Sequence, residues 1–258
     1  MFQREQVLLH EARVDWGRGF GDLEAIFASM KVKAVIMSHN TPVTTRALYE
    51  ALSPVFDVMV MDSGSDEGQS PECPAERYAN LYYTGCWNEA MRRFGDYDVV
   101  WMIGGDVKLE NSPREYRDAI LSALPFGIWS PVISGHCREV GAKKMAWGRV
   151  FNVYHLEGIA MAISGDMVRH IGSIPGCNRL GWGIDIWLSW IGWSTGRRNI
   201  LDGRVSLFHP EGCGYSREQA RKEMGEFLEM AVGPNWMADT RCLPHQGLFE
   251  NNLRGVSL

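Results

Sequence analysis

The sequence has 258 residues, of which 45% are hydrophobic and 22% charged, and its formal net charge is −5. This composition is that of a globular protein rather than a disordered or fibrous one, and the length suffices for one substantial core in a single α/β domain. The negative charge argues against indiscriminate binding to nucleic acid, although a local basic patch is compatible with it.

The cysteines and the apolar runs indicate the compartment. None of the six cysteines forms a CxxC pair or a cluster with metal-ligand spacing, which favours thiols in a reducing compartment. The N-terminal residues contain only a short apolar run, and nowhere is there an uninterrupted apolar span of about 18 residues. We therefore expect a cytoplasmic protein without a signal peptide or membrane anchor.

The first elements alternate between strand and helix. A strand is predicted from Lys33 to Ser38 (KAVIMS), and a helix begins near Thr41 and Pro42, where proline suits the first turn. A second strand, Asp57 to Met61 (DVMVM), ends at the polar turn 62–66 (DSGSD), where glycine permits a sharp bend.

The next segment leads to a glycine-rich strand end. Residues 67–77 contain prolines and are predicted to be a loop, followed by a short strand at 81–83 and a helix from about 84 to 94, ended by Gly95. A further strand, 98–103 (DVVWMI), stops at GGD, residues 104–106. An apolar strand that ends on glycines and one carboxylate can present that carboxylate to a ligand.

A capping box begins the following helix. Ser112 and Glu115 can each satisfy the free backbone amide of the other, and Pro113 suits the first turn of SPREYRDAILSAL.

The second half of the chain is less regular. Its segments are GIWSPVIS (127–134), RVFNVYHLEG (149–158), IAMAIS (159–164), a short helix at 166–170, an aromatic-rich helix at 184–193 after GWGID, and the motif LFHPEGCGYS (207–216). An amphipathic helix follows, with Ala220, Met224, Phe227, Leu228 and Ala231 on one face.

Polar residues recur where predicted strands end. In open parallel sheets, ligands bind beyond the carboxyl ends of the strands. The candidates at these ends are Ser38, Asn40, Asp62, Ser63 and Asp106, together with Asp185 and His209 later in the chain. Each residue alone has an ordinary structural explanation as well: a helix cap, an Asx-turn, a turn carboxylate, a charge at a helix N-terminus or a buried core histidine.

Together, the motifs AVIMSHN, MDSGS, YYTGCWNEAM, GGD and GWGID resemble those of nucleotide-sugar-dependent glycosyltransferases of the GT-A fold, in particular glycosyltransferase family 2. The resemblance runs from about Lys33 to Ser216. It implies an α/β fold with a single Rossmann-like domain, in which helices flank a mixed, mainly parallel central sheet. The residues that it implies for binding the nucleotide sugar, a UDP-sugar, are Ser38, Asn40, Asp62, Ser63, Asn88, Gly105 and Asp106.

The resemblance also implies a divalent cation, Mn²⁺ or Mg²⁺. Family members carry a DxD motif at this strand end, but here Gly104 takes the place of the first carboxylate, so that Asp106 is the only acidic ligand of the motif. His209 resembles a late metal ligand of such enzymes. The charge that develops on a departing nucleoside diphosphate must be neutralised by a hard cation or by fixed positive groups.

GWGID resembles the segment that carries the catalytic base. Asp185 would accept the proton of the attacking hydroxyl, with inversion at the anomeric carbon. Retention, which occurs with similar motifs among GT-A enzymes, is the alternative outcome. Gly183 would let the backbone approach a sugar closely, and Trp182 would stack on its apolar face. A structural tryptophan and a charge that interacts with the helix dipole are the alternatives.

The segment HCREVGAKKMAWGR mixes positive charge with an aromatic ring. Arg138, Lys143, Lys144 and Trp147 would suit a phosphate-bearing acceptor, because basic side chains neutralise phosphates and rings stack on bases. The alternative is a solvated loop with one core tryptophan. The expected acceptor is a soluble glycan or, as in some bacteriophage enzymes, a 5-hydroxymethylpyrimidine base of DNA; a phage protein would act in the host cytoplasm.

The predicted organisation follows from these motifs. Residues 1–32 are an N-terminal extension, 33–110 the nucleotide-sugar-binding half, 111–232 the acceptor-binding half and 233–258 a C-terminal tail. Two other functions stay open: a catalytically degenerate nucleotide-sugar-binding protein, because of Gly104, and a sugar-phosphate nucleotidyltransferase. The second lacks support in AVIMSHNTP, which is not the glycine-rich loop with arginine and lysine of such enzymes.

Overall fold

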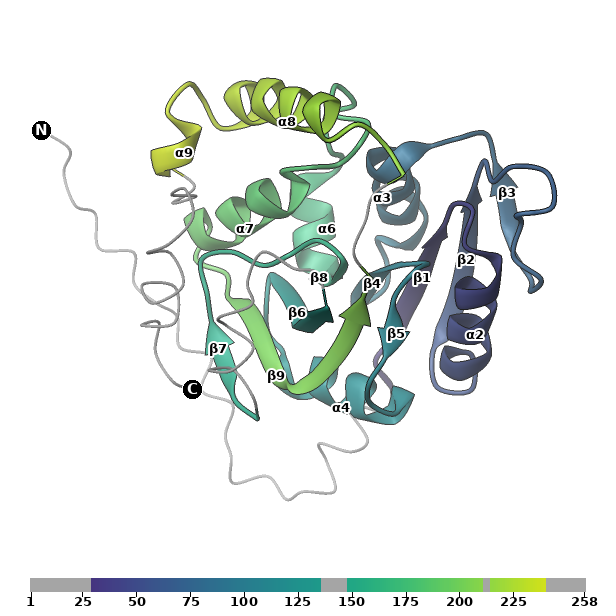
Figure 1. The fold of residues 1–258 in the computed structure, drawn as a ribbon. Helices are drawn as coiled ribbons and strands as arrows, with labels where there is room; N and C mark the ends of the chain where they lie inside the picture. The colour runs from purple at the N-terminus through teal and green to yellow at the C-terminus, as the bar shows by residue number, and fades with distance from the viewer. Residues whose placement is uncertain (1–28, 136–147, 211–213, 240–258) are drawn as a thin grey trace, which may run out of the picture. The chain divides into compact units, whose positions relative to one another are not determined.

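The computed structural model of the chain describes residues 29–135, 148–210 and 214–239. The chain divides into two compact units, residues 1–30 and 31–258, and the fold below is that of the second. Its elements in chain order (Figure 1) are β1 (Val32–Ser38), α2 (Pro42–Leu52), β2 (Asp57–Ser63), β3 (Glu76–Tyr78), α3 (Tyr82–Phe94), β4 (Val99–Gly104), β5 (Lys108–Leu109), α4 (Pro113–Ala123), β6 (Ile128–Gly135), β7 (Val150–Asn152), β8 (Ala160–Ser164), α6 (Gly165–Ile171), α7 (Ile184–Ser194), β9 (Asn199–His209), α8 (Arg217–Ala231) and α9 (Trp236–Asp239).

The described strands form one sheet in the order β3-β2-β1-β4-β8-β6-β9-β5, and β7 pairs with β9 beside this path. Strands β1 to β4 are parallel to one another, and β6 is parallel to β9. Strand β8 runs antiparallel to both β4 and β6, so all of these parallel strands end at the same edge. The predicted α/β fold with a mixed, mainly parallel sheet is confirmed.

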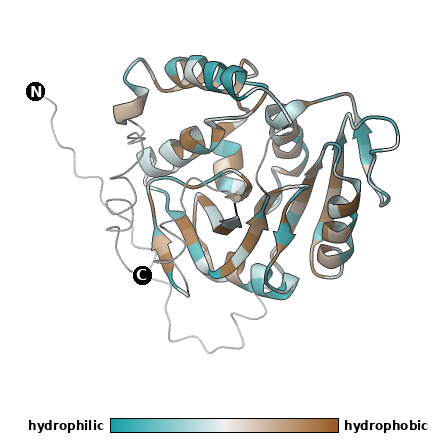
Figure 2. Ribbon diagram, in the orientation of Figure 1, coloured by the Kyte–Doolittle hydropathy of each residue, from teal (hydrophilic) through white to brown (hydrophobic). Residues whose placement is uncertain are grey.

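Helices cover both faces of this sheet. Helices α3, α6, α7 and α8 contribute to one buried cluster, which includes Trp87, Met102 and Phe227. On the other face, Trp101 of β4 packs against Tyr116 of α4, with ring centroids 5.3 Å apart. In Figure 2 the central strands are largely hydrophobic, whereas α8 shows a hydrophilic side. The buried residues of α8 face the core, where Phe227 packs against Trp187 of α7. None of the described helices has both the length and the apolar character needed to span a membrane.

Helix α4 begins with the predicted capping box. The Ser112 hydroxyl accepts the Glu115 N–H, and the Glu115 carboxylate accepts the Ser112 N–H at 2.8 Å. Such a cap is worth about 1 kcal/mol. The cap fixes where the chain leaves the sheet after β5, because it sets the first turn of α4.

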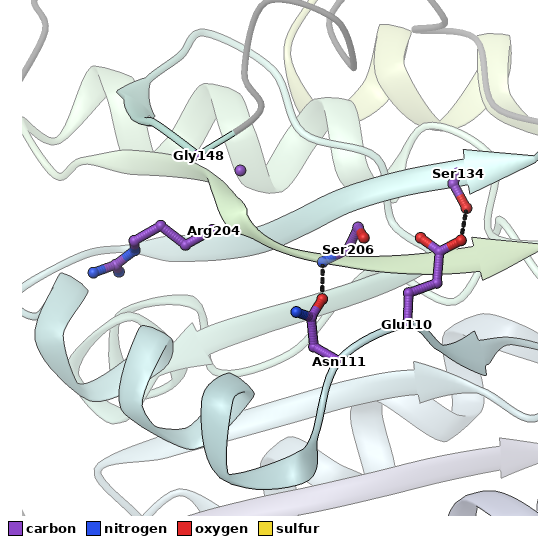
Figure 3. A pocket seen from close by; sticks show the side chains of 7 residues that line it. Glu110, Asn111, Ser134, Gly148, Arg204 and Ser206 are labelled. Atoms are coloured by element: carbon purple, nitrogen blue, oxygen red, sulfur yellow. Dashed lines mark hydrogen bonds between the residues drawn. The ribbon is translucent and has the colours of Figure 1, made fainter.

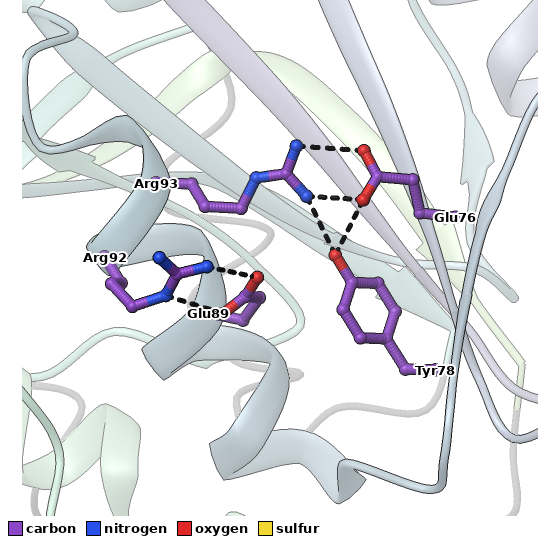
Figure 4. Close-up of polar contacts among 5 residues, drawn as sticks. All are labelled: Glu76, Tyr78, Glu89, Arg92 and Arg93. Carbon is purple, nitrogen blue, oxygen red and sulfur yellow. Dashed lines mark hydrogen bonds and ion pairs between the residues drawn. The ribbon is translucent and has the colours of Figure 1, made fainter.

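The predicted strand at 81–83 is wrong, and a strand lies in the predicted loop instead. Tyr82 and Tyr83 form the first turn of α3, whose buried residues begin at Thr84. Strand β3 lies within the predicted loop 67–77 and just beyond it. Arg93 of α3 donates to Glu76 and Tyr78 of β3, at 2.9 Å and 2.8 Å (Figure 4). This contact between distant residues stabilises a strand that has no apolar pattern of its own.

Strand β9 was not predicted before residue 207. Its sequence NILDGRVSLFH is interrupted by polar residues, but Asp202 is fully buried. The Asp202 carboxylate accepts hydrogen bonds from Arg204 at 2.6 Å and from the Trp129 indole at 3.1 Å. The register with β6 shifts at this point, between Pro131 and Val132. A buried carboxylate that pairs with a half-exposed arginine at a register shift therefore conceals the strand in the sequence.

Candidate functional site

The ends of β1, β2 and β4 lie side by side. Ser38 is in register with Asp62, and Met37 with Gly104. Ile103 is opposite Ala160, so β8 begins at the same edge. Asp62 and Ser63 are the last residues of β2, not the first of a turn. The predicted strand-end residues are thus brought together.

Asn40 connects the turns that follow β1 and β2. Its φ of 56° is in the left-handed region, which asparagine tolerates better than most residues. Its side-chain amide donates to the Asp66 carboxylate and accepts the Asp66 N–H, both at 2.8 Å, and its own N–H donates to Ser65 at 2.9 Å. Beside it, the His39 ring lies 2.9 Å from the Ser63 carbonyl. Asn40 therefore fixes the two turns relative to each other.

Ser38, Asp62 and Ser63 are buried and support these turns. The Asp62 side chain is 2% exposed, and it accepts the Ser65 N–H at 3.1 Å. Ser63 Oγ accepts the Leu81 N–H at 2.9 Å, and Ser38 Oγ accepts a hydrogen bond from Thr45 at 3.0 Å. Their polar atoms therefore hold the turns at this edge of the sheet through buried hydrogen bonds.

Asp106 and His209 come together where β4 and β9 end. Asp106 Oδ2 lies 3.4 Å from His209 Nε2, and the side chains are 41% and 16% exposed. Gly105 lets the chain before Asp106 pack closely against the end of β1, since a Cβ there would lie 2.7 Å from Thr41 Oγ1 and 2.8 Å from the Met37 carbonyl. The predicted carboxylate and imidazole are thus neighbours, although they are far apart in the sequence.

A carboxylate and an imidazole are a donor set that suits Mn²⁺ and accepts Mg²⁺. Two cis ligands of an octahedral ion lie about 3 Å apart, which is close to the observed 3.4 Å. Within the described residues, no group of three or more His, Cys, Asp or Glu side chains could hold a metal ion. From this part of the chain a cation would therefore take Asp106 and His209, and its other ligands would be diphosphate oxygens and water.

Asp185 lies in the first turn of α7. Its Oδ1 accepts the Ile186 N–H at 2.8 Å, and its Oδ2 accepts the Gly158 N–H at 3.4 Å. Gly183 precedes the helix with a φ of 88°, which favours glycine, and a Cβ there would lie 2.7 Å from Met224. The helix N-terminus and the two N–H groups favour the anionic form of the carboxylate.

Tyr83 of α3 lies beside this carboxylate. Its hydroxyl donates to the Gly158 carbonyl. Burial raises the pKa of Tyr83, as does the nearby Asp185 carboxylate, so the phenol stays neutral and acts as a donor. The Gly158 peptide group thus connects α3 to the first turn of α7.

The two acidic groups flank one short segment. Gly104, two residues before Asp106, donates its N–H to the Ile159 carbonyl at 3.0 Å. The adjacent Gly158 donates its N–H to the Asp185 carboxylate. The segment 158–159 at the beginning of β8 therefore separates the Asp106–His209 pair from Asp185. All three residues lie at the edge where β1, β2 and β4 end.

Trp182 is presented next to this edge by a rigid turn. Asn178 is fully buried; its side chain donates to the Trp182 carbonyl at 2.7 Å and accepts the Gly181 N–H at 2.9 Å. The Trp182 indole donates to the hydroxyl of Tyr215 at 2.8 Å, and Tyr215 is 41% exposed. Sequence reasoning missed Tyr215, Tyr83 and Asn178, because no local pattern connects them to the turn.

Asn88 has a structural partner. Its amide donates to the Ile174 carbonyl at 2.8 Å and accepts the Ile174 N–H at 2.7 Å. These bonds hold the loop after α6 against α3. Arg138, Lys143, Lys144 and Trp147 lie outside the described residues.

A cavity of about 470 Å³ lies beside β6, β9 and the residues that follow β5 (Figure 3). Ser134 Oγ donates to the Glu110 carboxylate at 2.7 Å, and the Ser206 N–H donates to Asn111 at 2.9 Å. The residues that line the cavity are Glu110, Asn111, Ser134, Gly148, Gly203, Arg204 and Ser206. Of the predicted site residues that the structure describes, none lines this cavity.

No protein-family model matches the sequence, and no curated protein matches it. Solved structures do match the fold. S. aureus TarS in complex with UDP-GlcNAc has a TM-score of 0.59 at 11% identity, over 86% of this chain and 69% of that chain. Glucosyl-3-phosphoglycerate synthase from Mycobacterium tuberculosis with Mn²⁺ and UDP-glucose has a TM-score of 0.57 at 14% identity, over 85% of each chain.

GalNAc-T7 with UDP, GalNAc and Mn²⁺ is similar as well, with a TM-score of 0.57 at 11% identity over 88% of this chain. The chain spans 55% of the length of that GalNAc-T7 chain. The α/β fold described above matches the fold of these similar structures. The chain therefore has the GT-A fold, the fold of nucleotide-sugar-dependent glycosyltransferases.

Proposed function

We propose that the chain is a glycosyltransferase that transfers a sugar from a UDP-sugar to a hydroxyl group of a soluble glycan, with inversion of the anomeric carbon. The observation that carries this proposal is the placement of the Asp106–His209 pair and of Asp185 on the two sides of the segment 158–159. A group that holds the diphosphate and a group that accepts a proton must flank the reacting carbon in this way.

The donor would bind over the ends of β1, β2 and β4, in the half formed by residues 33–110. The turns that Asn40 connects would receive the base and ribose, supported from beneath by Ser38, Asp62 and Ser63. Gly105 and Asp106 would lie beside the diphosphate. A divalent cation bound by Asp106 and His209 would neutralise the charge that develops there.

The acceptor would bind on the side of Asp185, in the half formed by residues 111–232. Asp185 takes the proton of the acceptor hydroxyl while the oxygen forms a bond to the anomeric carbon. The bond from that carbon to the diphosphate breaks, and its electron pair leaves with the diphosphate. The Trp182 ring, held by Tyr215, would stack on a sugar of the acceptor, which favours a glycan.

Donor binding is tested by thermal unfolding with a panel of UDP- and GDP-sugars, with and without Mn²⁺. A ligand that binds the folded state raises the melting temperature by mass action. We expect a rise with UDP-sugars that is larger in the presence of Mn²⁺. Asp106→Ala and His209→Ala should each remove the Mn²⁺ dependence, and an unchanged Mn²⁺ response in both variants would contradict the ligand assignment.

Catalysis is tested by sugar transfer and donor hydrolysis. We expect Asp185→Asn to lower turnover by a factor of about 100 or more, because the amide cannot accept the proton. Donor binding should be retained in this variant. Binding without turnover in the unaltered chain would support a catalytically degenerate binding protein. An acceptor panel of soluble oligosaccharides and 5-hydroxymethylated DNA separates the two acceptor classes, and transfer to DNA alone would contradict the glycan.

A further inference from the structure

The loop from residue 153 to 159, between β7 and β8, lies along one face of α7. The Leu156 N–H donates to Ser189 Oγ at 3.1 Å, and the Tyr154 and Trp193 rings pack with centroids 5.4 Å apart. Residues spaced by four lie on the same face of a helix, and Asp185 precedes Ser189 by this interval. The helix therefore fixes this loop at successive turns.

The same face of α7 holds the end of the loop beside the carboxylate. Gly158 donates its N–H to Asp185 Oδ2 at 3.4 Å and accepts the Tyr83 hydroxyl on its carbonyl. As a result, the loop residue before Leu156 is presented to the first turn of α7. That residue is His155, whose Nε2 lies 3.7 Å from Asp185 Oδ2.

The His155–Asp185 pair is largely shielded from water. The side chains are 16% and 25% exposed. The distance of 3.7 Å exceeds that of a hydrogen bond but lies within ion-pair range. Histidine is the side chain whose charge changes between pH 5 and 8, which makes it a suitable exchange partner for a carboxylate that receives a proton in every turnover.

We propose that His155 is a positioning residue that acts through Asp185, orienting the carboxylate and taking over the proton that Asp185 removes from the acceptor hydroxyl. This inference rests on the proposed function, since it names a second proton-handling group for the same reaction. It goes beyond the motifs of the family resemblance, none of which includes His155.

The proton balance is complete without a further reactant. In the transfer step, the acceptor O–H bond breaks, its proton goes to an Asp185 oxygen, and the diphosphate leaves with the electron pair of the broken sugar–oxygen bond. The proton then passes from Asp185 Oδ2 to the neutral Nε2 of His155, which leaves a carboxylate beside an imidazolium. The imidazolium loses the proton to solvent, and the pair returns to its initial state.

Other titratable groups near the pair are Tyr83 of α3 and Glu157 of the same loop. Tyr83 of α3 has its pKa raised by burial and by the charges of Asp185 and Tyr215, so it stays protonated throughout the relevant range. Glu157 lies on the same loop as His155. Asp185 is the group of α7 in ion-pair range of the imidazole.

The first test is the pH profile of turnover in the chain. It is measured in the presence of Mn²⁺ with a UDP-sugar that raises the melting temperature in the thermal-unfolding panel. In the unaltered chain, turnover falls as the pH drops through the imidazole range, because protonated His155 cannot accept the proton. In His155→Gln we expect a lower plateau and the loss of this limb, with the remaining acid limb in the carboxylate range. His170→Gln is the matched control, since His170 is exposed on α6.

The second test needs no turnover. The His155 imidazole is titrated by NMR in the unaltered chain and in Asp185→Asn, and its signal is assigned by its absence in His155→Gln. Removing a negative charge at 3.7 Å should lower the pKa of His155 by about one unit, while His170 should not shift.

The outcomes separate the two claims. Turnover with an unchanged acid limb in His155→Gln overturns the role of His155 alone, as does a His155 pKa that is equal in both proteins. Failure of every nucleotide sugar to be turned over by the unaltered chain overturns the proposed function, and the role of His155 with it.

Discussion

Gly104 determines how many carboxylates the chain offers a cation after β4. Its φ is not in the left-handed region, so a side chain is allowed by the backbone. A Cβ there would lie 2.9 Å from Asp106 Oδ1, which is the mobile end of a side chain that is 41% exposed. The position therefore tolerates a second carboxylate if Asp106 moves slightly.

We predict that Gly104→Asp makes folding stability more dependent on Mn²⁺. Without a cation, two carboxylates about 4 Å apart repel each other by about 1 kcal/mol in water, which corresponds to a melting temperature lowered by about 2–4 °C. When Mn²⁺ is present, both carboxylates can bind the cation and no longer repel each other. The rise in melting temperature on adding Mn²⁺ should therefore be larger in Gly104→Asp than in the unaltered chain. Gly104→Asn is the isosteric control, and an equal Mn²⁺ response in all three proteins would refute the prediction.

At the scale of elements, helix α8 holds the turn that presents Trp182. Glu223 is 5% exposed, and its Oε2 accepts the N–H groups of Arg179 and Leu180 at 2.9 Å and 3.0 Å. Its Oε1 accepts the Gln219 amide at 3.0 Å. One buried carboxylate on α8 thus satisfies two backbone donors of the turn before α7.

We predict that Glu223→Gln lowers the free energy of unfolding by about 1–3 kcal/mol, since the new NH₂ group must face a donor and leaves it unsatisfied. The turn should loosen, which a change in tryptophan fluorescence and a higher acceptor KM would report. Glu226→Gln is the control on the same helix, because Glu226 is 63% exposed. Equal stability of the two variants would mean that α8 does not fix the turn.

Elements with a local cause could be predicted from the sequence, and elements with a distant cause could not. The capping box of α4 and the strands around Ile36, Val60 and Met102 depend on adjacent residues. Strand β3 depends on Arg93, which follows it by 15 residues or more, and the polar part of β9 depends on the Trp129 indole, which donates to the buried Asp202 carboxylate from 73 residues earlier in the chain. Such pairs leave no periodicity in the sequence.

At the scale of the whole molecule, the topology of the sheet determines which of the predicted site residues lie close together. The resemblance named Asp106, Asp185 and His209, and the sheet brings all three to the edge where β1, β2 and β4 end. Asn88 at the nucleotide stays a prediction, and its hydrogen bonds within the fold go to Ile174. His155 could not be found from sequence, because its place beside Asp185 requires the loop to dock along the whole of α7.

Acid stability is a property to which carboxylates throughout the fold contribute. A hydrogen bond from Arg93 holds the pKa of Glu76 below its ordinary value of 4.5. Burial alone would raise the pKa of Asp57 and of Glu223, but hydrogen bonds outweigh it, from Lys33 and Tyr97 in the first case and from Gln219 and two backbone N–H groups in the second. The folded state therefore binds fewer protons than the unfolded chain at mildly acidic pH.

The sign of the resulting pH dependence follows directly. A carboxyl group whose folded pKa lies below its unfolded value contributes stability that is present above the unfolded value, and this stability is lost as the pH falls through the folded pKa. We predict that the melting temperature changes little from pH 7 to about pH 5 and falls steeply below about pH 4. Because Glu223→Gln removes one of these groups, its melting temperature should fall less between pH 7 and pH 3 than that of Glu226→Gln, whose exposed carboxylate has no comparable partners. Scanning calorimetry of both variants at the two pH values measures the difference, and an equal fall would show that Glu223 is not among the acid-sensitive groups.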